Sequence, residues 1–178
     1  MPHKILSRPD ATEYAPYYGK YTSLVPEGEL LATMTEQFER TLATLRNISE
    51  TQSLTRYEPG KWSIKEVVGH MVDTERIMSY RALRIARGDE TPLPGFEQDD
   101  YVRVVNSDAR PFAEIVDEFQ KVRQATLALF RSFEEAALRR RGTASNFAVS
   151  ALALTYIVAG HEKHHMNVLQ TKYLPLLK

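Results

Sequence analysis

The chain has 178 residues with 23 basic and 23 acidic side chains, so its formal net charge is zero. This balance gives no electrostatic basis for nucleic acid or an anionic membrane surface as a partner. The chain contains no cysteine, which excludes disulfides, thiolate metal sites and cysteine nucleophiles. Any metal must therefore be bound by His, Asp or Glu.

The length predicts a single domain, 1–178, that buries its core without help from a structural metal. The N-terminus lacks the apolar core of a signal peptide, and no stretch approaches the ~20 apolar residues of a membrane span. We therefore expect a cytoplasmic protein whose partner is a small-molecule substrate, with no nucleic acid and no membrane. A homodimer is compatible with these features.

Residues 1–27 are interrupted by prolines, which is typical of an ordered but irregular segment, here called the N-terminal strap. We expect His3 to be a surface residue. Four tyrosines of the strap are expected to cover a surface: Tyr14, Tyr17, Tyr18 and Tyr21.

Apolar residues then recur at helical spacing in four segments, which predicts an all-α four-helix bundle over residues 28–173. The second helix should begin with a capping box, in which Ser63 caps the amide of Glu66 and Glu66 reaches back. Residues 89–110 are long for a connection within a bundle and form one long crossover loop or cover a site. The expected helices span 27–49, 63–88, 111–135 and 147–173.

Histidines are concentrated near the end of the fourth segment, in the run from Gly160 to His165. His161 and His165 are one helical turn apart and share the inward stripe of that helix. His70 lies two turns inside the second helix, so packing of the two helices can complete a three-nitrogen metal site. A single buried histidine is commonly just hydrogen-bonded in the core, but two on one stripe would each need a polar partner, which one divalent cation supplies.

Three alternatives concern the same run of residues. His164 competes with His165 as the second ligand of the fourth helix, and we favour His165 because His164 continues a neighbouring line of smaller residues. The spacing from Glu162 to His165 matches half of a di-iron carboxylate site, but the remaining ligands of such a site are missing. The pair His161 and His165 also matches the zincin spacing, although the expected fold and third ligand do not suggest a protease.

Charged residues of the second helix have less specific interpretations. Asp73 follows His70 by about one turn and either orients a ligand, acts as a base or is simply solvated. Arg81 and Arg84 could bind an anionic substrate, but we expect them on a charged exterior face. Glu66 is explained by its capping role.

Five segments of the chain together match a known family pattern: residues 60–70, 73–76, 84–89, 92–96 and 160–165. In these segments the chain resembles the DinB-like family of metal-binding four-helix bundles, which includes YfiT-like hydrolases and bacillithiol transferases. The resemblance extends from about Tyr21 to Tyr173. It implies a divalent ion, zinc or nickel, on His70, His161 and His165, with water completing the shell and no catalytic side chain assigned.

Two classes of function follow from the resemblance and from the ligand chemistry. The first is a metal-dependent enzyme, either a transferase that activates a low-molecular-weight thiol or a hydrolase, acting on a small molecule. Three neutral imidazoles leave the ion its full charge and an open position, which is typical of catalytic sites. The alternative is a non-catalytic bundle that binds a metal or another ligand.

Overall fold

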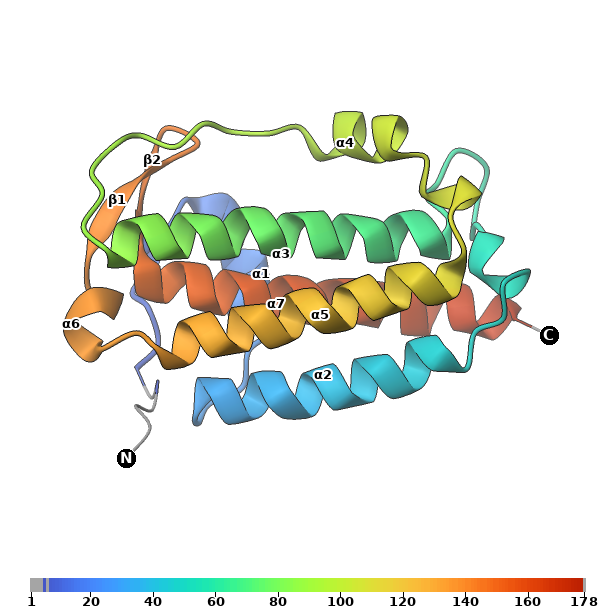
Figure 1. Cartoon of the computed structure of the whole chain (residues 1–178), viewed down its shortest axis with the longest axis horizontal. Coiled ribbons are helices and arrows are strands. Elements are labelled where there is room, and N and C mark those ends of the chain that lie inside the picture. Colours follow the sequence, from blue (N-terminus) through green and yellow to red (C-terminus); the bar gives the residue numbers. More distant parts are fainter. Residues whose placement is uncertain (1–4, 6, 178) are drawn as a thin grey trace.

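The computed structural model describes residue 5 and residues 7–177, and His3 lies outside this range. Four long helices lie side by side along the length of the molecule (Figure 1). Helix α3 packs against α5 and α7, and α2 packs against the same two helices. The predicted four-helix bundle is confirmed, and its helices are α2 (Leu30–Arg46), α3 (Ile64–Ala86), α5 (Phe112–Arg131) and α7 (Ala151–Val168).

Local sequence signals explain where helix α3 begins and ends. The Ser63 N–H donates to Glu66 Oε2 at 2.8 Å, and the Glu66 N–H donates to Ser63 Oγ at 3.1 Å. This is the predicted capping box. The helix ends at Ala86, and Gly88 follows with a φ of 81°, a conformation that side chains with a Cβ adopt at a cost.

The connection over residues 89–110 contains the short helix α4 (Gln98–Val105), which lies outside α3 (Figure 1). In the N-terminal strap, helix α1 (Gly19–Thr22) packs against α7. The remaining helical elements are the short helix α6 (Glu135–Leu138), a π-helical turn at Leu169–Tyr173 and five 3-10 turns at Ala11–Glu13, Pro16–Tyr18, Gln52–Leu54, Ser107–Ala109 and Leu174–Leu176.

The beginning of the fourth helix differs from the prediction. Strands β1 (Arg141–Ala144) and β2 (Phe147–Ser150) form an antiparallel hairpin, and α7 begins only at Ala151. Its first turn is capped by Ser150, whose Oγ accepts the Ala153 N–H at 2.9 Å. The two turn residues of the hairpin both have positive φ values, 51° at Ser145 and 65° at Asn146, as tight two-residue hairpin turns require.

The core consists of two hydrophobic clusters with a polar layer between them. One cluster lies toward the hairpin and includes Met34, Ala82 and Phe130; the other lies toward the opposite end of the bundle and includes Leu45 and Ile115. Between them each long helix contributes buried polar side chains: Gln37 from α2; His70, Thr74 and Glu75 from α3; Arg123 from α5; His161 and Glu162 from α7. Among the described residues, no helix is long and apolar enough to cross a membrane.

Candidate metal centre

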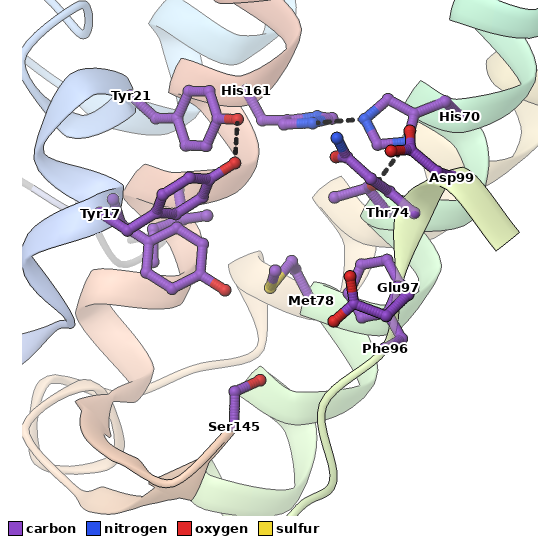
Figure 2. Close-up of a pocket in the computed structure, with 13 residues that line it drawn as sticks. Tyr17, Tyr21, His70, Thr74, Met78, Phe96, Glu97, Asp99, Ser145 and His161 are labelled. Atoms are coloured by element: carbon purple, nitrogen blue, oxygen red, sulfur yellow. Dashed lines mark hydrogen bonds between the residues drawn. The ribbon is translucent and has the colours of Figure 1, made fainter. Parts of the chain in front are cut away.

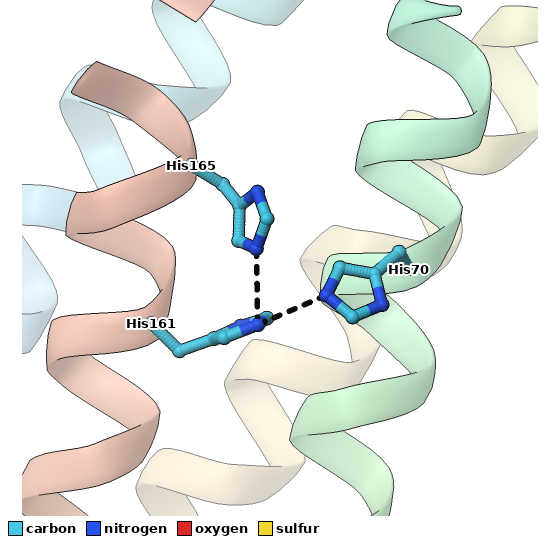
Figure 3. A group of neighbouring side chains, drawn as sticks. All are labelled: His70, His161 and His165. Atoms are coloured by element: carbon cyan, nitrogen blue, oxygen red, sulfur yellow. Dashed lines mark hydrogen bonds between the residues drawn. The ribbon is translucent and has the colours of Figure 1, made fainter. Parts of the chain in front are cut away.

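Three histidine side chains converge between helices α3 and α7 (Figure 3). The distance from His70 Nε2 to His161 Nε2 is 3.0 Å, and that from His165 Nε2 to His161 Nε2 is 3.1 Å. Nitrogens bound tetrahedrally at about 2.0–2.1 Å to one cation lie about 3.3–3.4 Å apart. The three donor nitrogens lie within 4.8 Å of one another, so small movements of the rings would let them share one divalent cation.

The protonation state of these rings suits metal binding. Burial, with a smaller contribution from the charge of His164, lowers the pKa of His70 to about 4. Burial, with smaller contributions from the neighbouring imidazoles, holds the pKa of His161 and of His165 well below the ordinary value of 6.5. All three rings are therefore neutral at pH 7 and can offer a lone pair.

Neighbouring side chains fix the orientation of the rings. Thr74 Oγ1 lies 3.4 Å from His70 Nδ1, a contact that favours protonation of Nδ1 and leaves the Nε2 lone pair directed at the other histidines. The ring of Trp62 packs against His70 with a centroid distance of 4.9 Å, and Tyr21 meets His161 edge to face at 5.2 Å. These contacts limit the freedom of two of the three rings before any ligand binds.

His164 lies outside the convergent group. Its ring packs on Tyr21 with a centroid distance of 5.3 Å, and within the described part of the chain only His70, His161 and His165 are grouped closely enough to hold one ion. The structure thus places His165, rather than His164, beside the other two histidines.

A buried charge network lies beside the histidines in the polar layer. Arg123 donates through Nε and Nη2 to the two carboxylate oxygens of Glu75, at 2.8 and 2.7 Å, and through Nη1 to Glu162 Oε2. Gln37 Nε2 donates to the same Glu162 oxygen at 2.7 Å and to the carbonyl of Ala159 at 3.0 Å.

This network explains Glu162, the residue shared by the di-iron and zincin alternatives. Its carboxylate is engaged by Arg123 and Gln37, and it does not belong to the group that could hold a metal. Arg123 was not predicted as a functional residue, although the sequence holds a signal: the residue interrupts the apolar stripe between Phe119 and Leu127. A charge on such a stripe requires a buried partner.

His70 and His161 open onto a cavity of about 310 Å³ (Figure 2), a volume suited to a small molecule. Its walls come from the strap, from α3 and α7, from the loop before α4 with the first turn of that helix, and from the hairpin turn. Tyr17 and Tyr21, whose hydroxyls are 3.3 Å apart, form one side of it. The lining residues are Tyr17, Tyr18, Tyr21, His70, Thr74, Met78, Phe96, Glu97, Gln98, Asp99, Ser145, Ile157 and His161.

The charged residues of α3 are placed differently from one another. Asp73 pairs with Arg76 at 3.7 Å and does not line the cavity; burial raises its pKa. Arg84 is partly exposed and pairs with Asp89. The prediction of an exterior position was wrong for Arg81. This residue is only 3% exposed, because the loop at Pro94 and the hairpin turn at Ser145 cover it.

Fold and site together define a helical bundle with a three-histidine candidate metal centre at the wall of a cavity. Residues 33–169 match the DinB superfamily, and the chain belongs to this superfamily.

Two similar proteins have names that refer to metal. A protein of Oceanobacillus iheyensis named "Putative metal-dependent hydrolase OB0413" is 24% identical over 125 residues, which cover 69% of this chain and 71% of that protein. The structure of YfiT from Bacillus subtilis, described as a probable metal-dependent hydrolase with an unusual four-helix bundle topology, is similar with a TM-score of 0.71. The match covers 96% of this chain and 93% of YfiT at 15% sequence identity, so it supports the fold.

Proposed function

We propose that the protein is a divalent-metal-dependent hydrolase of a small molecule, with the metal held by His70, His161 and His165. The observation that carries this proposal is the convergence of three neutral imidazoles, two of which line a cavity. The names of the two similar proteins point in the same direction. Zinc and nickel both suit a site made of imidazoles.

A divalent cation with nitrogen ligands and an open position supplies Lewis acidity, which polarises a carbonyl and lowers the pKa of a bound water or thiol. The chain supplies the rest. His70, His161 and His165 present lone pairs, while Thr74 Oγ1 lies 3.4 Å from the second ring nitrogen of His70, Nδ1, and helps to orient the ring. Tyr17 and Tyr21 restrict the access of water from one side of the cavity.

A proton acceptor for the reaction is best sought among the carboxylates of the cavity lining. These are Glu97 and Asp99, at the start of α4, and in Figure 2 Asp99 is seen on the same side of the cavity as His70. We assign the acceptor role to Asp99 in preference to Asp73, which pairs with Arg76 outside the cavity lining.

The decisive experiment compares metal content and turnover in matched variants. Wild type, His161→Ala and His164→Ala are purified without chelator, analysed for metal and assayed on a panel of small esters and amides with and without low-molecular-weight thiols. Hydrolysis without thiol that is lost in His161→Ala and kept in His164→Ala supports the proposal. Asp99→Asn should lower kcat and leave the metal content unchanged.

The other outcomes separate the alternative functions. Turnover that requires a thiol replaces hydrolase with thiol transferase, since the same open position accepts a thiol. Stoichiometric metal with no turnover of any substrate favours a binding protein. Equal metal content in wild type and His161→Ala contradicts the site itself.

A further inference from the structure

Arg81 is a buried cation that has no carboxylate partner within the described residues. Arg81 is 3% exposed. Its guanidinium donates to neutral groups: the carbonyl of Pro94 at 2.6 Å, Ser145 Oγ at 3.2 Å and the thioether of Met78 at 3.7 Å. The Tyr18 hydroxyl is a further neutral partner. Burying a charge is costly unless an opposite charge lies nearby. The guanidinium therefore needs an anion that the described chain does not provide.

The contrast with Arg123 shows that this fold can neutralise a buried guanidinium. Arg123 is also buried, and two glutamates surround it with direct ion pairs. Both arginines belong to the long helices of one bundle, yet only Arg123 receives carboxylates. The chain thus satisfies the charge in its polar layer and leaves the charge at Arg81 unmatched.

Arg81 lies directly behind the cavity wall. Four side chains that neighbour its guanidinium also line the cavity: Tyr18, Met78, Phe96 and Ser145. Arg81 itself borders a second cavity of about 300 Å³, which shares Phe96 with the first. An anionic group that passes the Phe96 ring can therefore reach the guanidinium.

The helical register connects Arg81 to the histidines. His70, Thr74, Met78 and Arg81 follow one face of α3 at intervals of four, four and three residues. The Cα atoms of His70 and Arg81 are separated by a rise of about 16 Å along the helix axis. The contact of Nη1 with Met78 shows that the guanidinium leans back along α3 toward the cavity.

We propose that Arg81, which borders the second cavity beyond Phe96, is the binding site for an anionic group of the substrate, most simply a carboxylate. This inference rests on the proposed function, because it takes the reacting group to lie at the histidines. It defines the substrate class as an elongated small molecule with an anionic end and a distant electrophilic carbonyl. A guanidinium offers the paired donors that a carboxylate accepts, and the hydroxyl of Ser145 can share the anion.

A binding assay tests this inference independently of turnover. The probes are 5-phenylpentanoate and its neutral analogue 5-phenylpentanamide, titrated calorimetrically into zinc-loaded and zinc-free wild type, Arg81→Gln, Arg81→Lys and Arg84→Gln. Arg81→Gln keeps a donor for Pro94 without the charge, and Arg81→Lys restores the charge. Arg84→Gln is the matched control because Arg84 lies one turn away on α3 and is paired with Asp89.

We expect wild type and Arg84→Gln to bind the carboxylate about 10- to 100-fold more tightly than the amide, with or without zinc. Arg81→Gln should bind both probes equally, and Arg81→Lys should recover part of the preference. A preference that disappears when zinc is removed but survives in Arg81→Gln would show that the carboxylate binds the metal, which overturns the proposal. Equal binding of both probes to wild type overturns it as well, whatever the turnover assay shows.

Discussion

His164 and His165 are adjacent in sequence but have different surroundings. His165 Nε2 lies 3.1 Å from His161 Nε2, whereas the His164 ring packs against Tyr21. We therefore expect His165→Ala to lose most of the metal affinity and His164→Ala to retain it. Isothermal titration of zinc into the metal-free variants measures this difference, and the reverse ranking would mean that α7 presents His164 to the site.

Gly160 is required by the close approach of the strap to α7. A Cβ at this position would lie 2.0 Å from the backbone oxygen of Tyr21, and backbone cannot move aside as a side chain can. We expect Gly160→Ala to destabilise the fold by about 1–3 kcal/mol or more, as overpacked core positions do, and to displace Tyr21 from His161. Denaturant unfolding measures the loss.

Gly19→Ala is the control for this variant. Gly19 lies in helix α1 with nothing within 4 Å of an added Cβ. This change should leave the unfolding midpoint unchanged or raise it, since alanine is the better helix former. Equal effects of the two substitutions would contradict the role of the close approach at Gly160.

The sequence was sufficient to predict the three histidines but not the position of Arg81. His161 and His165 could be recognised because a spacing of four residues places two imidazoles on one helical face, a property of a single element. His70 is added because its helix is expected to pack against theirs. Arg81 lies on a helix with other arginines nearby, and its burial depends on the carbonyl of Pro94 and the hydroxyl of Ser145. These contacts join Arg81 to residues 13 and 64 positions away in the sequence, so no local sequence pattern indicates them.

At the scale of helices, the Arg123 network connects α5 to α3 and α7 through Glu75 and Glu162. Arg123→Leu leaves two buried carboxylates without their partner, which should cost about 3–5 kcal/mol of unfolding free energy. Lys121→Met is the control, because Lys121 pairs with Asp117 on the exposed face of the same helix and should have little effect. Urea denaturation followed by circular dichroism compares the two. A small loss for Arg123→Leu would show that the carboxylates become protonated or find other partners.

The π-helical turn after α7 is fixed by Tyr173, whose hydroxyl donates to the Trp62 carbonyl at 2.7 Å. Burial raises the pKa of Tyr173 to about 12, from an ordinary value of 10. The folded state therefore binds more protons than the unfolded state between these values, and stability falls as the pH rises from about 10 to 12. We expect this alkaline loss to be smaller in Tyr173→Phe. Thermal unfolding at pH 9 and pH 11.5 checks the prediction. An equal fall in melting temperature between the two pH values in both proteins would contradict it.

The hairpin shows which elements the periodicity of the sequence cannot resolve. Phe147–Ser150 is apolar enough to continue the stripe of α7 backward, and strands of four residues give too short an alternation to be recognised. In the structure, the positive φ values at Ser145 and Asn146 form the hairpin turn, and the cap at Ser150 fixes the start of α7 after the second strand. The long helices are predicted well because each has several turns of consistent pattern.

For the whole molecule, the position of the histidines between two hydrophobic clusters determines the effect of metal removal. Each cluster is held by residues from several helices and needs no ion. Chelation should therefore leave the helical circular dichroism intact and lower the stability only by the free energy of binding, about 3–4 kcal/mol at 100 to 1,000 times the Kd. Thermal unfolding with and without chelator measures this. Loss of helicity on chelation would make the ion structural.

The histidines lie on two long helices, whereas many of the residues that would select a substrate lie on the strap, the loop before α4 and the hairpin turn. Reactivity and selectivity can therefore diverge separately in evolution. We expect exchange of residues 93–97 or 143–147 between relatives to change which substrates are accepted while the imidazoles stay in register. Directed evolution toward new substrates should therefore begin with these segments and keep His70, Arg81, His161 and His165 unchanged.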